Sequence, residues 1–281
     1  MTSKEAVSGT RLSVSTWSLH RTLGNPRSYG VDQEIPVESH GRGALTLLEL
    51  PQRLADFGIH TLEICHFHLP TRDAGYLREL RAALEQADIE LFSFLVDDGD
   101  ITHPDPATLE RNIRWINQWF DVASQLGARC VRVVAGKAAP SPESLDQSVR
   151  ELGPLAERAQ AQGMRLMTEN WLNLLSTPQA VRSVCERLDG KVGLCFDFGN
   201  WRGEGKYADL EQIVAYAESC HTKAHFDAPF ELDRADYERC LEITRRAQFA
   251  GPYTLIYDGP NADEWTGLAL ERDIVQPYIL S

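Results

Sequence analysis

The stretch "ATLERNIRWINQWFDVASQLGARCVRVVAG", residues 107–136, contains the unit from which we expect the fold to be built. Residues 107–127 carry apolar side chains at helical spacing, and Gly127 closes the segment, because a glycine in the left-handed conformation commonly ends a helix. The run "RCVRVVAG" at 129–136 is short, apolar and β-branched, which predicts a strand. One glycine therefore separates a predicted helix from a predicted strand.

The same alternation runs along the whole chain. Further segments with helical spacing lie at 46–58, 75–88 and 144–163, and Gly153-Pro154 is expected to interrupt the last of them. Predicted strands lie at 11–19, 60–69, 89–98, 129–136, 164–171, 191–201, 219–227 and 252–259. Alternating strands and helices at intervals of about 30 residues predict parallel strands joined by crossover helices, and eight such units close a barrel. We therefore expect an α/β fold, a (β/α)8 TIM barrel, as one domain over residues 1–281.

An open doubly wound sheet is the alternative to the barrel. Such sheets usually have five or six strands and carry G-x-G-x-x-G at the first strand-to-helix turn, and this sequence lacks that motif there. Residues 20–44 form an unusually long connection between the first strand and its helix. A loop of this length over the mouth of a barrel is a candidate lid, with a tether of no function as the alternative.

The charge and composition of the chain indicate which kinds of binding partner to expect. The net charge of −13, from 41 acidic and 28 basic residues, repels phosphate backbones and anionic lipids, so neither nucleic acid nor a membrane is expected as a partner. The six cysteines form no C-x-x-C pair and are expected to be reduced core thiols. The first residues resemble no secretory signal and no run of about 18 apolar residues occurs, which predicts a cytoplasmic protein.

Polar side chains stand where the later strands end. The apolar run "VGLCFD" stops at Asp197, "RLMTE" stops at Glu169 and "YTLIYD" stops at Asp258. His221 and Lys223 share a face of the strand before the last, because strand residues two apart point the same way. The carboxyl ends of barrel strands meet at one mouth, so we expect these groups to converge there.

Carboxylates and one imidazole form a set that suits a divalent cation such as Mg²⁺, Mn²⁺, Co²⁺ or Zn²⁺. Taken singly, each residue has another explanation. Glu169 could be the partner of an arginine, and Asp197 could cap the segment that follows it. The predicted convergence of four groups favours the metal site.

Other candidates lie near the same mouth. In the second strand Glu63 and the pair His66 and His68 have opposite phases. We expect Glu63 to point inward as a candidate substrate contact, and the histidines to be structural or to lie at the rim, where His68 is also a candidate substrate contact. Trp17 is a candidate for stacking on a sugar ring, together with Trp171, Phe198 and Trp201. Arg132 and Lys137, in and after the fourth strand, are a candidate phosphate-holding pair.

The sequence resembles the sugar phosphate isomerase/epimerase group of the xylose isomerase-like barrels, whose fold is shared with endonuclease IV. The resemblance runs from "LSVSTWSL" to "GPYTLIYDG" and is most specific in "TLEICHFHLP", "LGARCVRVVAG", "LMTEN" and "CFDFGNW". It implies a divalent metal held by Glu169, Asp197 and His221, with Lys223 completing the family's His-x-Lys pattern and His225 as the substitute if the register differs. It further implies that a glutamate removes a proton next to a carbonyl to give an enediolate.

Two positions depart from the family pattern. Ile256 stands where the family has the strand-eight glutamate, so Asp258, two residues later, is the candidate replacement both as fourth ligand and as catalytic group. Asn200 stands where the family often has a histidine, and it can bind substrate but cannot titrate. These two departures impair a two-base epimerase, whereas a one-base isomerase, a lyase acting next to a carbonyl and a protein that binds its ligand without turnover are each compatible with them.

We expect a metal-dependent isomerase or epimerase of a sugar or sugar phosphate, with Glu169 as base. A lyase or dehydratase of the same chemistry and a non-catalytic sugar-binding subunit are the alternatives. An abasic-site endonuclease is disfavoured for two reasons. Its cluster of several metals needs many histidines at the strand ends, whereas the eight histidines of this chain are dispersed along the sequence. Its DNA substrate also needs a cationic protein surface, whereas this chain has a net charge of −13. A small carbohydrate is the expected partner, and a homodimer remains open.

Overall fold

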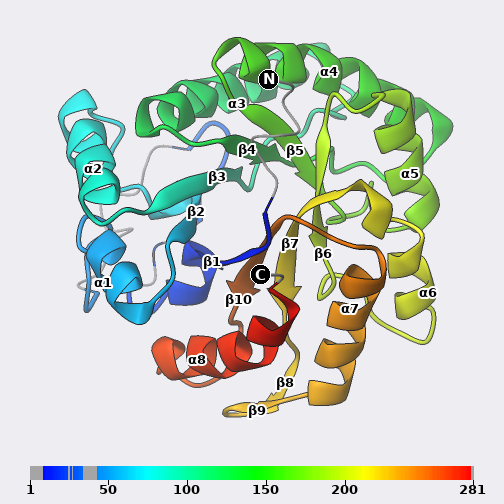
Figure 1. Ribbon diagram of the computed structural model, residues 1–281. Coiled ribbons are helices and arrows are strands. Elements are labelled where there is room, and N and C mark those ends of the chain that lie inside the picture. The colour runs from blue at the N-terminus through cyan, green and yellow to red at the C-terminus, as the bar shows by residue number, and fades with distance from the viewer. Residues whose placement is uncertain (1–8, 25, 27, 34–42, 280–281) are drawn as a thin grey trace.

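Parallel strands form a closed barrel in the computed structural model, which describes residues 9–24, 26, 28–33 and 43–279 (Figure 1). Its strands are β1 (Arg11–Ser15), β2 (Thr61–Cys65), β3 (Glu90–Val96), β4 (Cys130–Val133), β5 (Arg165–Glu169), β6 (Gly193–Asp197), β7 (Ala217–Lys223) and β10 (Pro252–Ile256). They follow one another around the ring as β1-β10-β7-β6-β5-β4-β3-β2, and every neighbouring pair is parallel. The predicted barrel is confirmed.

Helices connect the strands and surround the barrel (Figure 1). They are α1 (Leu50–Phe57), α2 (Ala74–Gln86), α3 (Pro106–Leu126), α4 (Pro142–Ala161), α5 (Pro178–Arg187), α6 (Lys206–Glu211), α7 (Arg234–Arg246) and α8 (Glu264–Val275). Short 3-10 turns lie at Thr16–Leu19, His66–His68, Val214–Tyr216 and Gln276–Tyr278, and a small hairpin of β8 (Phe226–Ala228) and β9 (Glu231–Leu232) precedes α7. Gly127 ends α3 at φ 79°, a backbone conformation that glycine adopts without the strain of a side chain.

The expected interruption of α4 at Gly153-Pro154 is wrong. The helix continues through Pro154 to Ala161. Proline removes one backbone hydrogen bond, but Leu152 and Leu155 lie on the buried face of the helix on either side of it. Packing of that face outweighs the local cost, since most helical stability in proteins comes from tertiary contacts.

The long connection at 20–44 lies partly outside the described residues, so the expected lid at 20–44 does too. Its described part packs on the barrel. Tyr29 is buried, and its carbonyl accepts a hydrogen bond from His66 Nε2 at 2.7 Å. Among the described residues, no helix has both the length and the apolar character needed to cross a membrane.

The barrel interior is layered. Phe92, Cys130, Met167 and Cys195 are fully buried and form a small apolar cluster separate from the main core. Three of these residues stand two positions before Arg132, Glu169 and Asp197 in their strands. Since strand residues two apart share a face, the charged residues occupy the next interior layer toward the carboxyl ends. The six cysteines are all free and buried, as predicted.

Glu271 on α8 is a buried carboxyl group outside this layer. It is fully buried, and among the described residues neither carboxylate oxygen makes a hydrogen bond of normal geometry, although the nearby backbone of Ile256 acts to lower its pKa. Burial raises the pKa of Glu271 well above its usual range, and the charge of Asp258 acts in the same direction. Above the ordinary pKa of a glutamate, the unfolded chain releases this proton while the folded protein keeps it. The contribution of Glu271 to the free energy of unfolding is therefore largest at acid pH and falls as the pH rises.

We expect Glu271→Met to raise the free energy of unfolding by about 1–3 kcal/mol at pH 8, because it removes an unsatisfied buried polar group. The gain should be smaller at pH 4.5, where the carboxyl is protonated in the folded state and already about half protonated in the unfolded chain. Urea unfolding at the two pH values measures it, with Glu79→Met on the exposed side of α2 as the control. An equal gain at both pH values would show that Glu271 does not cause the pH dependence.

Candidate functional site

A cavity of about 100 Å³ opens at the carboxyl ends of the barrel strands. Six ionisable side chains from successive strands and the turns after them line it: Asp97, Arg132, Glu169, Asp197, His221 and Lys223. Trp17 and Trp171 contribute aromatic walls, and Ile256 lines the side that β10 provides. The cavity is therefore charged along the ends of β3 to β7 and uncharged along β10, β1 and β2.

His221 is the centre of the charged layer. Its Nε2 lies 2.7 Å from Glu63 Oε2, and its Nδ1 lies 3.9 Å from Glu169 Oε1 and 3.8 Å from Asp197 Oδ2. The carboxylate of Glu63 can only accept, so Nε2 is the donor and Nδ1 is turned toward the other two carboxylates. Burial alone would lower the pKa of His221, but Cys195, Glu63 and Asp197 together hold that pKa well above its usual range.

Glu63 thus points into the barrel, as its phase in β2 suggests, and is fully buried there. Its carboxylate contacts His221 and does not line the cavity.

We expect Glu63→Gln to weaken any metal bound at His221 Nδ1 by about 10–100-fold, the usual effect of losing a carboxylate behind a histidine ligand. Metal titration measures this, with Glu79→Gln as the exposed control; unchanged affinity would contradict the orienting role.

Glu169 is held on both sides. Its Oε1 accepts a hydrogen bond from Asn200 Nδ2 at 2.8 Å. Its Oε2 lies 3.1 Å from Arg132 Nε, yet neither atom makes a hydrogen bond among the described residues, so this contact is an ion pair only. Burial raises the pKa of Glu169, while the charges of Arg132 and His221 oppose that rise. The arginine partner that the sequence left open for Glu169 is present, alongside the convergence with His221.

Arg132 also binds Asp97. Arg132 Nη2 lies 2.6 Å from Asp97 Oδ1, and both side chains are almost fully buried. Burial by itself would raise the pKa of Asp97, but Arg132 and His66 lower it below its usual range. Lys137 is likewise paired, with Asp98. Arg132 and Lys137, the two cations expected to hold a phosphate, are therefore both paired with carboxylates. The sequence did not predict that Arg132 would join Asp97 and Glu169 inside the barrel.

Asp197 both caps the segment after its strand and faces His221. Its Oδ1 accepts hydrogen bonds from the backbone amides of Gly199 at 2.7 Å and Asn200 at 3.0 Å, so it caps the segment after β6. Its Oδ2 is the oxygen near His221. The side chain of Asn170 bonds to the backbone N–H and C=O of Asp197, at 2.8 and 2.7 Å, which fixes the end of β6.

Asp258 does not join this cluster. Its side chain is 52% exposed and lies 3.2 Å from Lys223 Nζ, and it lines a neighbouring cavity of about 440 Å³ together with His225. Asp258 cannot take the place of Ile256, because β10 ends at Ile256 and strand alternation, which would put residues two apart on one face, does not apply beyond that residue. The structure thus gives no support to Asp258 as fourth ligand or catalytic group.

The remaining candidates divide between the two cavities and the core. Trp17 lies beneath Lys223, whose Nζ is 5.8 Å from the ring centroid. His225 is half exposed and lies near Asp227. His68 is buried beside His20, and neither lines the charged cavity. Among the other aromatic candidates, Trp201 lines the second cavity and Phe198 packs on Tyr237 in the core.

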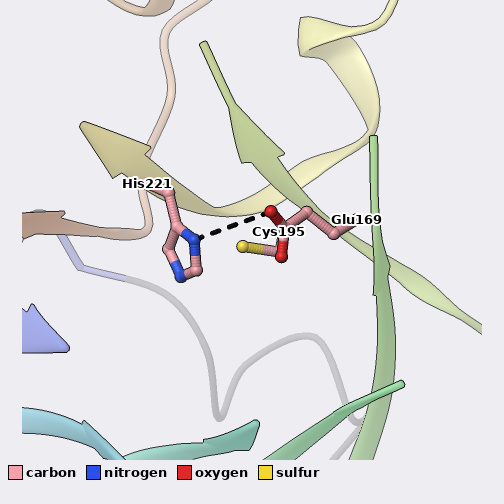
Figure 2. Close-up of side chains that lie close together, drawn as sticks. All are labelled: Glu169, Cys195 and His221. Atoms are coloured by element: carbon pink, nitrogen blue, oxygen red, sulfur yellow. Dashed lines mark ion pairs between the residues drawn. The ribbon is translucent and has the colours of Figure 1, made fainter. Parts of the chain in front are cut away.

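The donor set suits a divalent cation. Among the described residues, one group of three potential ligands has ligand atoms all within 4.8 Å of one another, namely Glu169, Cys195 and His221 (Figure 2). Asp197 lies outside this group, with its Oδ2 3.8 Å from His221 Nδ1. Glu63 behind the imidazole is the kind of partner that orients a histidine ligand at such a site.

Comparison with solved structures shows the same fold. D-allulose 3-epimerase from Methylomonas sp. superposes with a TM-score of 0.70 at 14% identity, covering 96% of this chain and 98% of the other. A magnesium complex of a xylose isomerase-like TIM barrel protein from Mycobacterium smegmatis gives 0.68 at 16% identity, with 99% of both chains covered. A probable 3-DHS dehydratase from Bacillus anthracis gives 0.69 at 16% identity, with 95% and 98% covered.

At these identities the likeness is one of fold. No curated protein sequence matches this chain significantly. The family model described as "Xylose isomerase-like TIM barrel" matches residues 51–272, which is most of the chain. The chain therefore belongs to the xylose isomerase-like TIM barrel family.

Proposed function

We propose that this protein is a metal-dependent isomerase or epimerase of a sugar or sugar phosphate, which moves a proton on the carbon next to a carbonyl through an enediolate. The observation that carries the proposal is the convergence of Glu169, Asp197 and His221 from three successive strands on one buried cavity. The fold is shared with D-allulose 3-epimerase, which is consistent with this chemistry.

Glu169 is the proposed base. Its raised pKa makes the carboxylate a stronger proton acceptor, and general bases work best when their pKa approaches the working pH. Asn200 fixes one oxygen, while the other oxygen makes no hydrogen bond among the described residues and is paired only with the charge of Arg132, so it is the oxygen proposed to take the proton. When bound at Glu169, Asp197 and His221, a divalent metal would supply polarisation of the substrate carbonyl.

Two further residues have positions suited to the substrate. Lys223 lines both cavities, so its ammonium group can donate to a substrate oxygen at the boundary between them. Trp17 forms an aromatic wall beside it, against which the apolar face of a sugar ring can stack. These two residues would orient the substrate rather than exchange its proton.

A lyase or dehydratase is the second candidate, and one observation favours it. Ile256 lines the side of the cavity where the family pattern places a glutamate, so the second proton-transfer group of a two-base epimerase is missing there. An elimination needs no group to return the proton to the same carbon. Structural likeness to a probable dehydratase is compatible with this alternative.

Proton NMR in D₂O tests the proposal. The metal-loaded protein is incubated with a panel of ketoses, aldoses and their phosphates, and we expect deuterium at the carbon next to the carbonyl together with an isomer or epimer. Loss of water from a substrate instead of isomerisation would establish the dehydratase. If no panel member exchanges a proton while sugars still bind, the protein is a sugar-binding subunit.

A further inference from the structure

Cys195 lies one layer below the candidate metal ligands. It stands two positions before Asp197 in β6, so both side chains point into the barrel. Its sulfur, an oxygen of Glu169 and a nitrogen of His221 all lie within 4.8 Å of one another. Figure 2 shows the thiol directed into the space between the carboxylate and the imidazole.

The site has an unfilled requirement that Cys195 can meet. The family pattern has a carboxylate on the last barrel strand, where this chain has Ile256, and Asp258 lies in the neighbouring cavity. Without a further donor, a cation at His221 Nδ1 would have only Glu169 and Asp197 as additional protein ligands. Of the described side chains, Cys195 is the one that shares a ligand-sized space with both Glu169 and His221.

We propose that Cys195 is a metal ligand, and that Glu169, Cys195 and His221 form a mixed oxygen, sulfur and nitrogen site that selects Zn²⁺ or Co²⁺ over Mg²⁺. The inference rests on the metal site of the proposed function and specifies its ligands. Thiolate sulfur is a soft ligand that zinc and cobalt accept, whereas magnesium requires oxygen ligands. Binding converts the thiol to a metal-bound thiolate and displaces any proton held on His221 Nδ1, and each displaced proton passes to solvent.

Cobalt spectroscopy tests the proposal without any substrate. The metal-free, full-length protein is titrated with Co²⁺, and a thiolate ligand gives an intense sulfur-to-cobalt charge-transfer band in the near ultraviolet. We expect this band in the wild type and its loss in Cys195→Ser. The matched control is Cys130→Ser, since Cys130 belongs to the same buried interior cluster and should leave the band intact.

Metal competition gives the expected size of the effect. Zn²⁺ should displace Co²⁺, and a large excess of Mg²⁺ should not. Zinc affinity in Cys195→Ser should fall by more than the about 10–100-fold that loss of an outer partner costs. X-ray absorption at the zinc edge of the wild-type protein supplies a measurement that no variant can confound by misfolding, with a sulfur shell expected at about 2.3 Å.

Several results would overturn the proposal. They are a cobalt complex without the sulfur band, a zinc shell of nitrogen and oxygen alone, equal loss of the band in both cysteine variants, and failure of the protein to bind either ion. The proposed function is judged separately. Proton exchange with a sulfur-free metal shell would refute only the role of Cys195, and a sulfur-containing shell without proton exchange on any sugar would refute only the isomerase.

Discussion

Glu169→Gln is expected to lower the rate of substrate proton exchange by about 10²–10⁴-fold, the contribution typical of a positioned general base. Glutamine has nearly the same shape, and its carbonyl can still accept the hydrogen bond from Asn200. It cannot take a proton from carbon, and it offers a weaker ligand than a carboxylate. The bound metal should therefore be reduced as well, which elemental analysis of the purified variant measures together with deuterium exchange.

The matched control for this prediction is Glu186→Gln. Glu186 lies on α5, is exposed and forms an ion pair with Arg182, so the same chemical change there should leave exchange and metal content unaltered. Raising the metal concentration separates the two roles of Glu169. Exchange that returns at saturating metal would mean that Glu169 is a ligand only, and wild-type exchange in the variant would place the base elsewhere.

The barrel and the residues at its strand ends were predictable from the sequence because they depend on local patterns. Apolar β-branched runs fix where strands lie, and parallel alternation fixes which ends meet. Glu169 and Asp197 therefore appear at the mouth where their strands end. Asp258 shows the limit of the same reasoning, because a periodicity of two holds only while the chain is a strand and β10 stops at Ile256.

The partners of these residues could not be read from the sequence. Glu63 and His221 are 158 residues apart, and Arg132 and Asp97 are 35 apart. Such contacts exist only when the ring closes, and no local pattern encodes which buried cation faces which carboxylate. Arg132 lies in an apolar strand and resembled a ligand-binding cation, whereas the closed barrel pairs it with the buried carboxylates of Asp97 and Glu169.

Cys195 was missed as a potential ligand for a related reason. A cysteine in an apolar run is usually a core thiol, and Cys195 does contact the interior apolar cluster. Its distance to Glu169 and His221 depends on how the interior layers are stacked, which the sequence does not specify. Strand periodicity offered one indication of this role, because Cys195 and Asp197 stand two residues apart on the same face of β6.

Arg132→Met should cost about 3–5 kcal/mol of unfolding free energy, because it leaves the buried carboxylates of Asp97 and Glu169 without their cation. Methionine fills a similar volume, so the loss reports charge rather than a cavity. Arg129→Met, the same substitution three residues earlier, is the matched control. Arg129 is half exposed and paired with Glu90, and exposed ion pairs contribute about 0–1 kcal/mol to stability. Urea unfolding at pH 7 measures both.

The double variant Arg132→Met with Asp97→Asn separates electrostatics from packing. Removing one of the two stranded charges should recover part of the lost stability, as expected for residues in direct contact, whose effects are not additive. Full additivity of the two substitutions, or a loss in Arg132→Met no larger than in Arg129→Met, would contradict a stabilising buried bridge. In that case the guanidinium would be retained for the charge it places beside Glu169, and the cost of Arg132→Met would appear in proton exchange instead of in unfolding.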